Sequence, residues 1–149
     1  MGRSQILHVD DDPNDVLLVR QACRKAGLNC EWQALNDGDE AIAYFQGADK
    51  FADRDQYPLP NLVLLDLKMA RLSGFDVLAW LRQNAKWHSL PVVVLTSSNQ
   101  EADVQRAYSL GANSYLVKPV DFEKLVEIVQ AVHHYWLNFN VLPDAHLPS

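Results

Sequence analysis

The chain has 149 residues, of which 48% are hydrophobic, and a formal net charge of -6 at pH 7. This length suits one domain with a substantial core, and the acidic balance argues against nucleic acid as a partner. Cys23 and Cys30 are too few for a disulfide framework and lack metal-ligand spacing, so we expect a reduced, cytoplasmic protein. No apolar run approaches the roughly 20 residues that span a bilayer, and the start resembles no secretion signal, so no membrane partner is expected.

Short apolar runs alternate with amphipathic segments along the whole chain. In chain order we expect strand 5–10, helix 14–26, strand 30–35, helix 39–46, strand 61–66, helix 74–83, strand 91–96, helix 100–110, strand 114–118 and helix 121–137. Strands that alternate with helices predict a parallel sheet with helices on both faces. The expected fold class is therefore α/β, a doubly wound five-stranded sheet in a three-layer α/β/α arrangement.

Polar side chains follow four of the predicted strands at the point where each strand ends. They are Asp11 and Asp12, Asp66, Thr96 and Lys118. Because the carboxyl ends of parallel strands share one edge, where ligands bind, these groups should form one pocket. Three carboxylates repel one another unless a hard cation such as Mg²⁺ lies among them. A lysine and a threonine beside that cation would suit a phosphoryl group.

This set of residues resembles the CheY-like receiver domain of two-component response regulators. The resemblance rests on the acidic pair, on Asp66 followed by Leu67–Lys68–Met69, on Thr96–Ser97–Ser98, and on Tyr115 with Lys118–Pro119. These pieces occur in receiver order and spacing from about residue 4 to residue 133. The resemblance implies the strand order 2-1-3-4-5 and a flavodoxin-like fold.

The resemblance also implies a role for each site residue. A histidine kinase would transfer its phosphoryl group to Asp66. Mg²⁺ would be bound by Asp12 directly, by Asp11 through water, by Asp66 and by the backbone carbonyl of Lys68. The amides of Lys68 and Ser97, the Thr96 hydroxyl and the Lys118 ammonium would contact the phosphoryl group. Tyr115 would move inward together with Thr96, and Pro119 would follow a cis bond.

Other interpretations of the same residues stay open at this stage. Asp11 and Asp12 could form a turn with a helix cap, and Thr96 and Tyr115 could be ordinary strand residues. A haloacid-dehalogenase-type phosphatase also uses a strand-end aspartate, but it needs a second aspartate where this chain has Lys68. A flavodoxin-like carrier needs a phosphate-binding loop after the first strand, where Asp10–Asp11–Asp12 would repel the phosphate. A third alternative is an interaction module that is no longer phosphorylated.

Two segments exceed a minimal receiver, whose core we place at about 4–133. Residues 47–60 form a long polar connection, expected either as a solvated loop or as a partner contact. Residues 134–149 form an aromatic extension, with no output domain after it. We expect the extension to pack on its own chain or between two chains. The expected homodimer or partner face contains Tyr108, Asn113, Tyr115, Tyr135 and Trp136.

The chain has a second resemblance, to regulators that accompany bacterial phytochrome kinases. It rests on the length of a receiver that stands alone, on the connection of residues 47–60, on residues 113–119 and on Tyr135–Trp136–Leu137. That resemblance makes a kinase that senses red or far-red light one expected partner, with a chemotaxis-type or other sensor kinase as the alternative. Ala70 stands where receivers usually carry proline, and neither Lys68 nor Ser98 has a carboxamide to orient water. The lifetime of the phosphoryl group is therefore left open.

Overall fold

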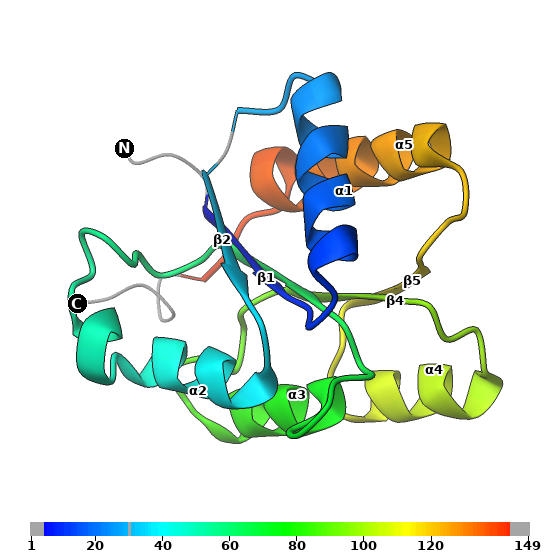
Figure 1. Ribbon diagram of the computed structural model, residues 1–149. Helices are drawn as coiled ribbons and strands as arrows, with labels where there is room; N and C mark the ends of the chain where they lie inside the picture. Colours follow the sequence, from blue (N-terminus) through cyan, green and yellow to red (C-terminus); the bar gives the residue numbers. More distant parts are fainter. Residues whose placement is uncertain (1–4, 30, 144–149) are drawn as a thin grey trace.

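Five parallel strands form a single sheet in a computed structural model that describes residues 5–29 and 31–143. The strands are β1 (Gln5–Val9), β2 (Glu31–Leu35), β3 (Leu62–Leu65), β4 (Val92–Thr96) and β5 (Ser114–Val117). Their order is β2-β1-β3-β4-β5, and every neighbouring pair is parallel (Figure 1). The fold class and strand order expected from the sequence are confirmed.

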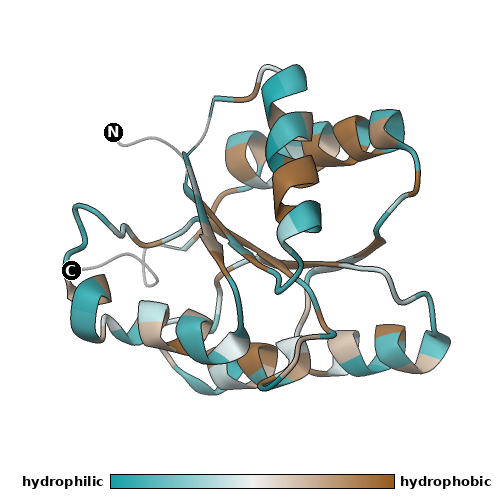
Figure 2. Cartoon of the chain, viewed as in Figure 1, coloured by the Kyte–Doolittle hydropathy of each residue, from teal (hydrophilic) through white to brown (hydrophobic). Residues whose placement is uncertain are grey.

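Helices cover both faces of this sheet. They are α1 (Pro13–Lys25), α2 (Gly38–Gln46), α3 (Gly74–Gln83), α4 (Glu101–Ser109) and α5 (Phe122–Val132). Helices α1 and α5 lie on one face, and α2, α3 and α4 lie on the other (Figure 1). Hydrophobic and hydrophilic residues are interspersed along the helices (Figure 2), and the residues that the helices bury are mostly hydrophobic. This is the three-layer arrangement expected for a parallel sheet.

Strand β3 shows how the two cores form. Its side chains alternate between the faces, as the pleat of a strand requires. Val63 and Leu65 belong to the core beneath α2, α3 and α4, whereas Leu62 and Leu64 belong to the core beneath α1 and α5. All four are buried, so the strand is apolar throughout. A strand buried on both faces can pair with its neighbours in only one register. That register sets where its carboxyl end lies relative to the ends of the neighbouring strands.

The connection of residues 47–60 packs against the protein itself. It contains a 3-10 helix, η1 (Asp49–Ala52), whose Phe51 is buried. The hydroxyl of Tyr44 donates a 2.6 Å hydrogen bond to the Pro58 carbonyl, and Arg54 Nη2 donates one of 3.1 Å to the Phe45 carbonyl. Phe51 and Tyr57 of the connection therefore pack with Tyr44 in the core beneath α2, α3 and α4. A connection that is only a solvated loop would not be buried in this way.

The C-terminal extension divides between the core and the surface. Helix α5 ends at Val132 and continues as a π-helix, η2 (His133–Phe139), rather than as the single helix expected to residue 137. Trp136 and Leu137 pack against the core beneath α1 and α5. Tyr135 is 55% exposed and Phe139 is 73% exposed. Cys30 and residues 144–149, about which the sequence made predictions, lie outside the described residues.

Candidate functional site

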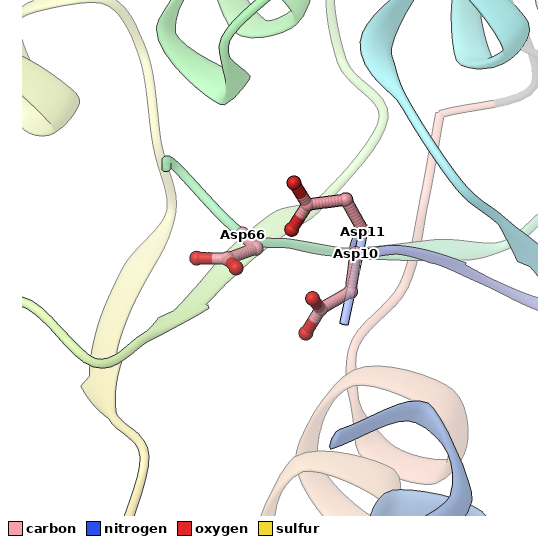
Figure 3. Close-up of side chains that lie close together, drawn as sticks. All are labelled: Asp10, Asp11 and Asp66. Atoms are coloured by element: carbon pink, nitrogen blue, oxygen red, sulfur yellow. The ribbon is translucent and has the colours of Figure 1, made fainter. Parts of the chain in front are cut away.

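Three aspartates from two neighbouring strands meet at the carboxyl edge of the sheet. Asp10 and Asp11 follow β1, and Asp66 follows β3, which pairs with β1 so that Val9 lies opposite Leu65. One carboxylate oxygen from each aspartate lies within 4.8 Å of the others (Figure 3). Asp10 and Asp66 are buried, while Asp11 is exposed. The group is thus open to solvent from the side of Asp11.

The acidic pair expected at Asp11 and Asp12 is corrected to Asp10 and Asp11. Asp12 is the N-cap of α1, and its side chain accepts a 2.9 Å hydrogen bond from the Asn14 amide. Pro13 occupies the first helical position, where its fixed φ favours helix formation and its missing N–H is not needed. The residue before it must cap the helix, and this directs the Asp12 carboxylate away from Asp66.

The aspartate group has the composition of a binding site for a hard cation. Asp66 Oδ1 is buried and has no hydrogen-bond partner among the described residues. A carboxylate oxygen in that state is costly unless something else satisfies it. Carboxylate oxygens are the ligands that Mg²⁺ and similar divalent cations prefer, so the residues fit such an ion. The Lys68 carbonyl and the choice of Mg²⁺ over other divalent cations stay predictions.

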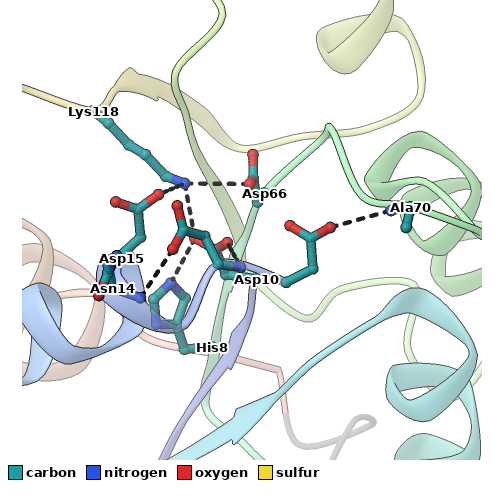
Figure 4. Close-up of polar contacts among 9 residues, drawn as sticks. His8, Asp10, Asn14, Asp15, Asp66, Ala70 and Lys118 are labelled. Atoms are coloured by element: carbon teal, nitrogen blue, oxygen red, sulfur yellow. Dashed lines mark hydrogen bonds and ion pairs between the residues drawn. The ribbon is translucent and has the colours of Figure 1, made fainter.

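Lys118 balances part of this negative charge. Its Nζ lies 2.8 Å from Asp10 Oδ2, 2.7 Å from Asp15 Oδ2 and 3.2 Å from Asp66 Oδ2 (Figure 4). Burial by itself would lower the pKa of Lys118, but the hydrogen bonds to Asp10 and Asp15 and the charge of Asp66 raise it above its usual value. Lys118 is therefore a fixed ammonium, and an oxygen of Asp66 is one of its acceptors.

Two titratable side chains at the end of β1 are buried, and burial shifts their pKa values in opposite directions: Asp10, a member of the aspartate group, and His8. Burial raises the pKa of Asp10 to about 6, although hydrogen bonds from Lys118 and from the Asp12 amide favour the carboxylate. Burial, together with the charge of Lys118, lowers the pKa of His8 to about 4. His8 Nε2 lies 3.8 Å from Asp10 Oδ2, and the ring packs edge-on against Trp32. His8 is therefore a neutral core residue.

Thr96 and Tyr115 lie on β4 and β5, the two strands that continue the sheet beyond β3. Thr96 is fully buried at the end of β4, and its Oγ1 lacks a hydrogen-bond partner within the described chain. The Lys118 amide donates a 2.8 Å hydrogen bond to the Thr96 carbonyl. The Tyr115 hydroxyl donates one of 2.9 Å to the Ser98 carbonyl. The bond before Pro119 is trans, like every other peptide bond among the described residues, so the cis expectation is wrong.

A second set of contacts joins the two loops at the mouth of the site. Lys68 follows Asp66 by two residues, and its Nζ lies 3.2 Å from Asp103 Oδ2 on α4. Ser98 follows Thr96 by two residues, and its hydroxyl donates a 2.6 Å hydrogen bond to the same oxygen. These contacts hold the pKa of Asp103 below its usual range. Ser97, whose amide is an expected phosphoryl ligand, precedes Ser98 in the loop after β4 and is exposed.

The expected partner face surrounds the edge strand β5. Tyr108 is 49% exposed on α4. The Asn113 side-chain oxygen is already used internally, because it accepts hydrogen bonds from Arg82 Nη2 at 2.9 Å and from the Val92 amide at 2.8 Å. A groove of about 410 Å³ lies along β5, α5 and η2, and Tyr135 and Trp136 line part of it. The expected residues thus lie near one sheet edge without forming one continuous aromatic surface.

The sequence agrees with known regulators over nearly its whole length. Residues 6–130 match the response regulator receiver domain family. Response regulator Rcp1 of Synechocystis sp. is 37% identical over 140 residues, which cover 94% of this chain and 93% of Rcp1. The probable methanogenesis regulatory protein FilR2 of Methanothrix harundinacea is 36% identical over 138 residues, covering 93% of this chain and 86% of FilR2.

Solved structures give the same result. The phosphorylated cyanobacterial phytochrome response regulator RcpA superposes on this chain with a TM-score of 0.87 at 31% identity. The superposition covers 95% of this chain and 99% of the RcpA chain. RPA3017, a response regulator in red light signalling of R. palustris, has a TM-score of 0.89 at 35% identity, with 94% and 98% covered. The Mn²⁺-bound form of Rcp1 has a TM-score of 0.82 at 36% identity, with 94% and 99% covered. The chain therefore belongs to the response regulator receiver domain family, and phytochrome-associated regulators are among its close structural neighbours.

Proposed function

We propose that the protein is a phosphoacceptor whose Asp66 receives a phosphoryl group from a histidine kinase in a reaction that depends on Mg²⁺. The observation that supports this most strongly is the state of the Asp66 carboxylate. One oxygen is fixed by Lys118, while the other is buried without a partner among the described residues, beside Asp10 and Asp11. An oxygen held in this way is oriented for in-line attack on phosphorus.

The residues divide the chemistry among them. An Asp66 oxygen forms a bond to phosphorus while the bond between phosphorus and the histidine nitrogen breaks, and the ring nitrogen keeps the electron pair. Lys118 neutralises charge on the phosphoryl oxygens, and the Thr96 hydroxyl and the amides of Lys68 and Ser97 donate hydrogen bonds to them. Asp10, Asp11, Asp66 and the Lys68 carbonyl would hold Mg²⁺, whose charge offsets the repulsion between the carboxylates and the phosphoryl group.

This function makes the protein a signalling component rather than an enzyme that turns over a substrate. The phosphatase alternative requires a general acid two residues after the nucleophile, and Lys68 is instead paired with Asp103. Loss of the phosphoryl group would occur through water: its oxygen bonds to phosphorus, the bond from phosphorus to the Asp66 oxygen breaks, and inorganic phosphate and the Asp66 carboxylate are released. Tyr115 would report the state of Thr96, because its hydroxyl is bonded to the loop that follows Thr96.

We also propose a phytochrome-type sensor kinase as the partner and a homodimer as the signalling form. Support for the kinase comes from the similarity to RcpA and RPA3017. Support for the dimer comes from exposed aromatic side chains: Tyr108 on α4, Tyr135 in the groove beside β5, and Phe139 at the end of η2. We further propose that residues 1–149 form one receiver unit that acts in the cytoplasm. No helix among the described residues is long and apolar enough to cross a membrane.

The proposal is tested by phosphotransfer. Histidine kinases from the same genome, each autophosphorylated with labelled ATP, are mixed briefly with this protein and with its Asp66→Asn variant. Rapid, Mg²⁺-dependent transfer from a phytochrome-type kinase to the wild type, and none to the variant, is the expected result. Transfer only from kinases of another sensory class would reject the phytochrome partner but keep the phosphoacceptor. Equal transfer to the variant would show that Asp66 is not the phosphoacceptor.

A further inference from the structure

The ammonium of Lys118 is shared by three carboxylates, one of which lies outside the expected site. Asp15 Oδ2 is 2.7 Å from Nζ, closer than the oxygen of Asp66 at 3.2 Å. Asp15 and Asp66 approach the ammonium from different sides, and Asp10 lies between them (Figure 4). An ammonium has three protons to donate. Each proton of Lys118 therefore already has a carboxylate acceptor.

The start of helix α1 fixes Asp15 in this position. Asp12 caps the helix and Pro13 is its first residue, so Asp15 falls in the first turn. A carboxylate there is favoured by the partial positive charge of the helix N-terminus. Its side chain is 30% exposed, whereas that of Lys118 is 14% exposed. Asp15 is therefore held in place by α1, and it is the more solvent-exposed partner in its ion pair with Lys118.

We propose that Asp15 is a positioning residue that holds Lys118 back from the phosphoryl group and slows phosphorylation of Asp66. This inference rests on the proposed function. For Lys118 to contact a phosphoryl oxygen, it must give up one of its present acceptors. Asp15 and Asp10 compete with the incoming phosphoryl group for the same three protons. Asp15 belongs to neither the aspartate group of Asp10, Asp11 and Asp66 nor the phosphoryl ligands, so it acts only through Lys118.

The direct test compares rates of phosphorylation by acetyl phosphate in the presence of Mg²⁺. In this reaction an Asp66 oxygen bonds to phosphorus, the bond from phosphorus to the acetate oxygen breaks, and acetate leaves. We expect Asp15→Asn to accelerate the reaction by roughly threefold, the size appropriate to one partly exposed ion pair. Asp15→Glu, which keeps a carboxylate, should return the rate toward that of the wild type. The control is Asp55→Asn, which removes one charge from an exposed residue of the 47–60 connection and should leave the rate unchanged.

A double-mutant cycle separates positioning from simple removal of charge. If Asp15 acts through Lys118, Asp15→Asn should have no effect on the rate in a Lys118→Met background. An equal acceleration in that background would overturn the inference and assign the effect to weaker repulsion of the anionic donor. A rate unchanged by Asp15→Asn in the native background would overturn it as well.

A readout without any phosphodonor keeps this inference distinct from the proposed function. Side-chain ammonium groups that are buried and hydrogen-bonded exchange their protons slowly and can be followed by ¹H–¹⁵N NMR. We expect the Lys118 ammonium to exchange with water faster in Asp15→Asn than in the wild type or in Asp55→Asn. No change would show that Asp15 does not hold Lys118. If Asp15→Asn speeds proton exchange at Lys118 but the wild type accepts no phosphoryl group, the proposed function is rejected. The conclusion that Asp15 holds Lys118 in place would still stand.

Discussion

The hydroxyl of Tyr115 donates a 2.9 Å hydrogen bond to the carbonyl of Ser98. This bond ties the edge strand β5 to the loop that follows Thr96 on β4. Thr96 itself is buried with a hydroxyl that has no partner in the described part of the chain. A ligand that draws Thr96 toward Asp66 would move the loop and strain the tyrosine contact. The aromatic ring at the sheet edge is therefore coupled to the interior of the site by one hydrogen bond.

Removing that hydroxyl should cost measurable stability. We expect Tyr115→Phe to lower the free energy of unfolding by about 0.5–1.5 kcal/mol, because the Ser98 carbonyl loses its donor. Urea denaturation measures the change. Tyr108→Phe is the matched control, since Tyr108 is 49% exposed and water can replace its contacts. Equal effects of the two substitutions would show that the Tyr115–Ser98 bond contributes nothing specific.

Metal binding should stabilise the fold through Asp11 and not through Asp12. Mg²⁺ at one hundred times its dissociation constant should raise the free energy of unfolding by about 2.7 kcal/mol. Asp11→Asn should remove most of this gain, because Asp11 contributes to the aspartate group. Asp12→Asn should retain it, because asparagine caps a helix as well as aspartate does. Thermal melts with and without Mg²⁺ measure both. The opposite ranking of the two variants would restore Asp12 as the ligand.

His8 should make the metal-free protein sensitive to acid. Its pKa is lowered to about 4 by burial, so between pH 6.5 and 4 the unfolded chain binds a proton that the folded chain does not. Stability is therefore lost as pH falls through this window, by on the order of 3 kcal/mol. The raised pKa of Asp10 acts in the opposite direction below about pH 6. The His8→Met variant separates the contribution of His8 from that of Asp10. With a chelator present to remove metal ions, the variant should lose less stability than the wild type between pH 6.5 and 4. Parallel curves for both proteins would contradict a neutral buried His8.

Self-association should depend on the exposed aromatic residues of the C-terminal extension. We expect a dimer by multi-angle light scattering, because a two-fold contact is the commonest way to cover such side chains. Tyr135→Ser combined with Phe139→Ser should shift the protein toward monomer without unfolding it, since the two residues are 55% and 73% exposed. Trp136 is left intact because it packs on the core. A wild type that is monomeric at every concentration would reject the homodimer.

The sequence predicted the elements well where local chemistry defines them. Helix α3 has the predicted bounds, Gly74–Gln83, because Ser73 and Asp76 form a capping box at its start. Gly74 also allows the chain to pass close to Asp66, since a Cβ there would lie 2.2 Å from the Asp66 carbonyl oxygen. Such signals depend on a few adjacent residues and can be read without knowing the fold.

Most of the missed features depend on neighbours that are distant in sequence. Asp12 is the exception: the resemblance implies it as a direct Mg²⁺ ligand, although the adjacent Pro13 already indicates a helix cap at Asp12. Asp15 reaches Lys118 across 103 positions of the chain, so no local pattern indicates that contact. Phe51 lies in a connection that the sequence indicates to be polar, and packing against Tyr44 and Tyr57 explains its burial. These outcomes reflect tertiary contacts that override local preference.

Intact-mass spectrometry after incubation with acetyl phosphate measures the phosphorylation of Asp66 without a kinase. We expect one added phosphoryl group per wild-type chain in the presence of Mg²⁺, stable in acid and lost in base, as an acyl phosphate should be. Chelation of Mg²⁺ and the Asp66→Asn substitution should each abolish the added mass, because an amide is a poor nucleophile. An equal mass increase in Asp66→Asn, or none in the wild type with Mg²⁺ present, would show that Asp66 is not the phosphoacceptor.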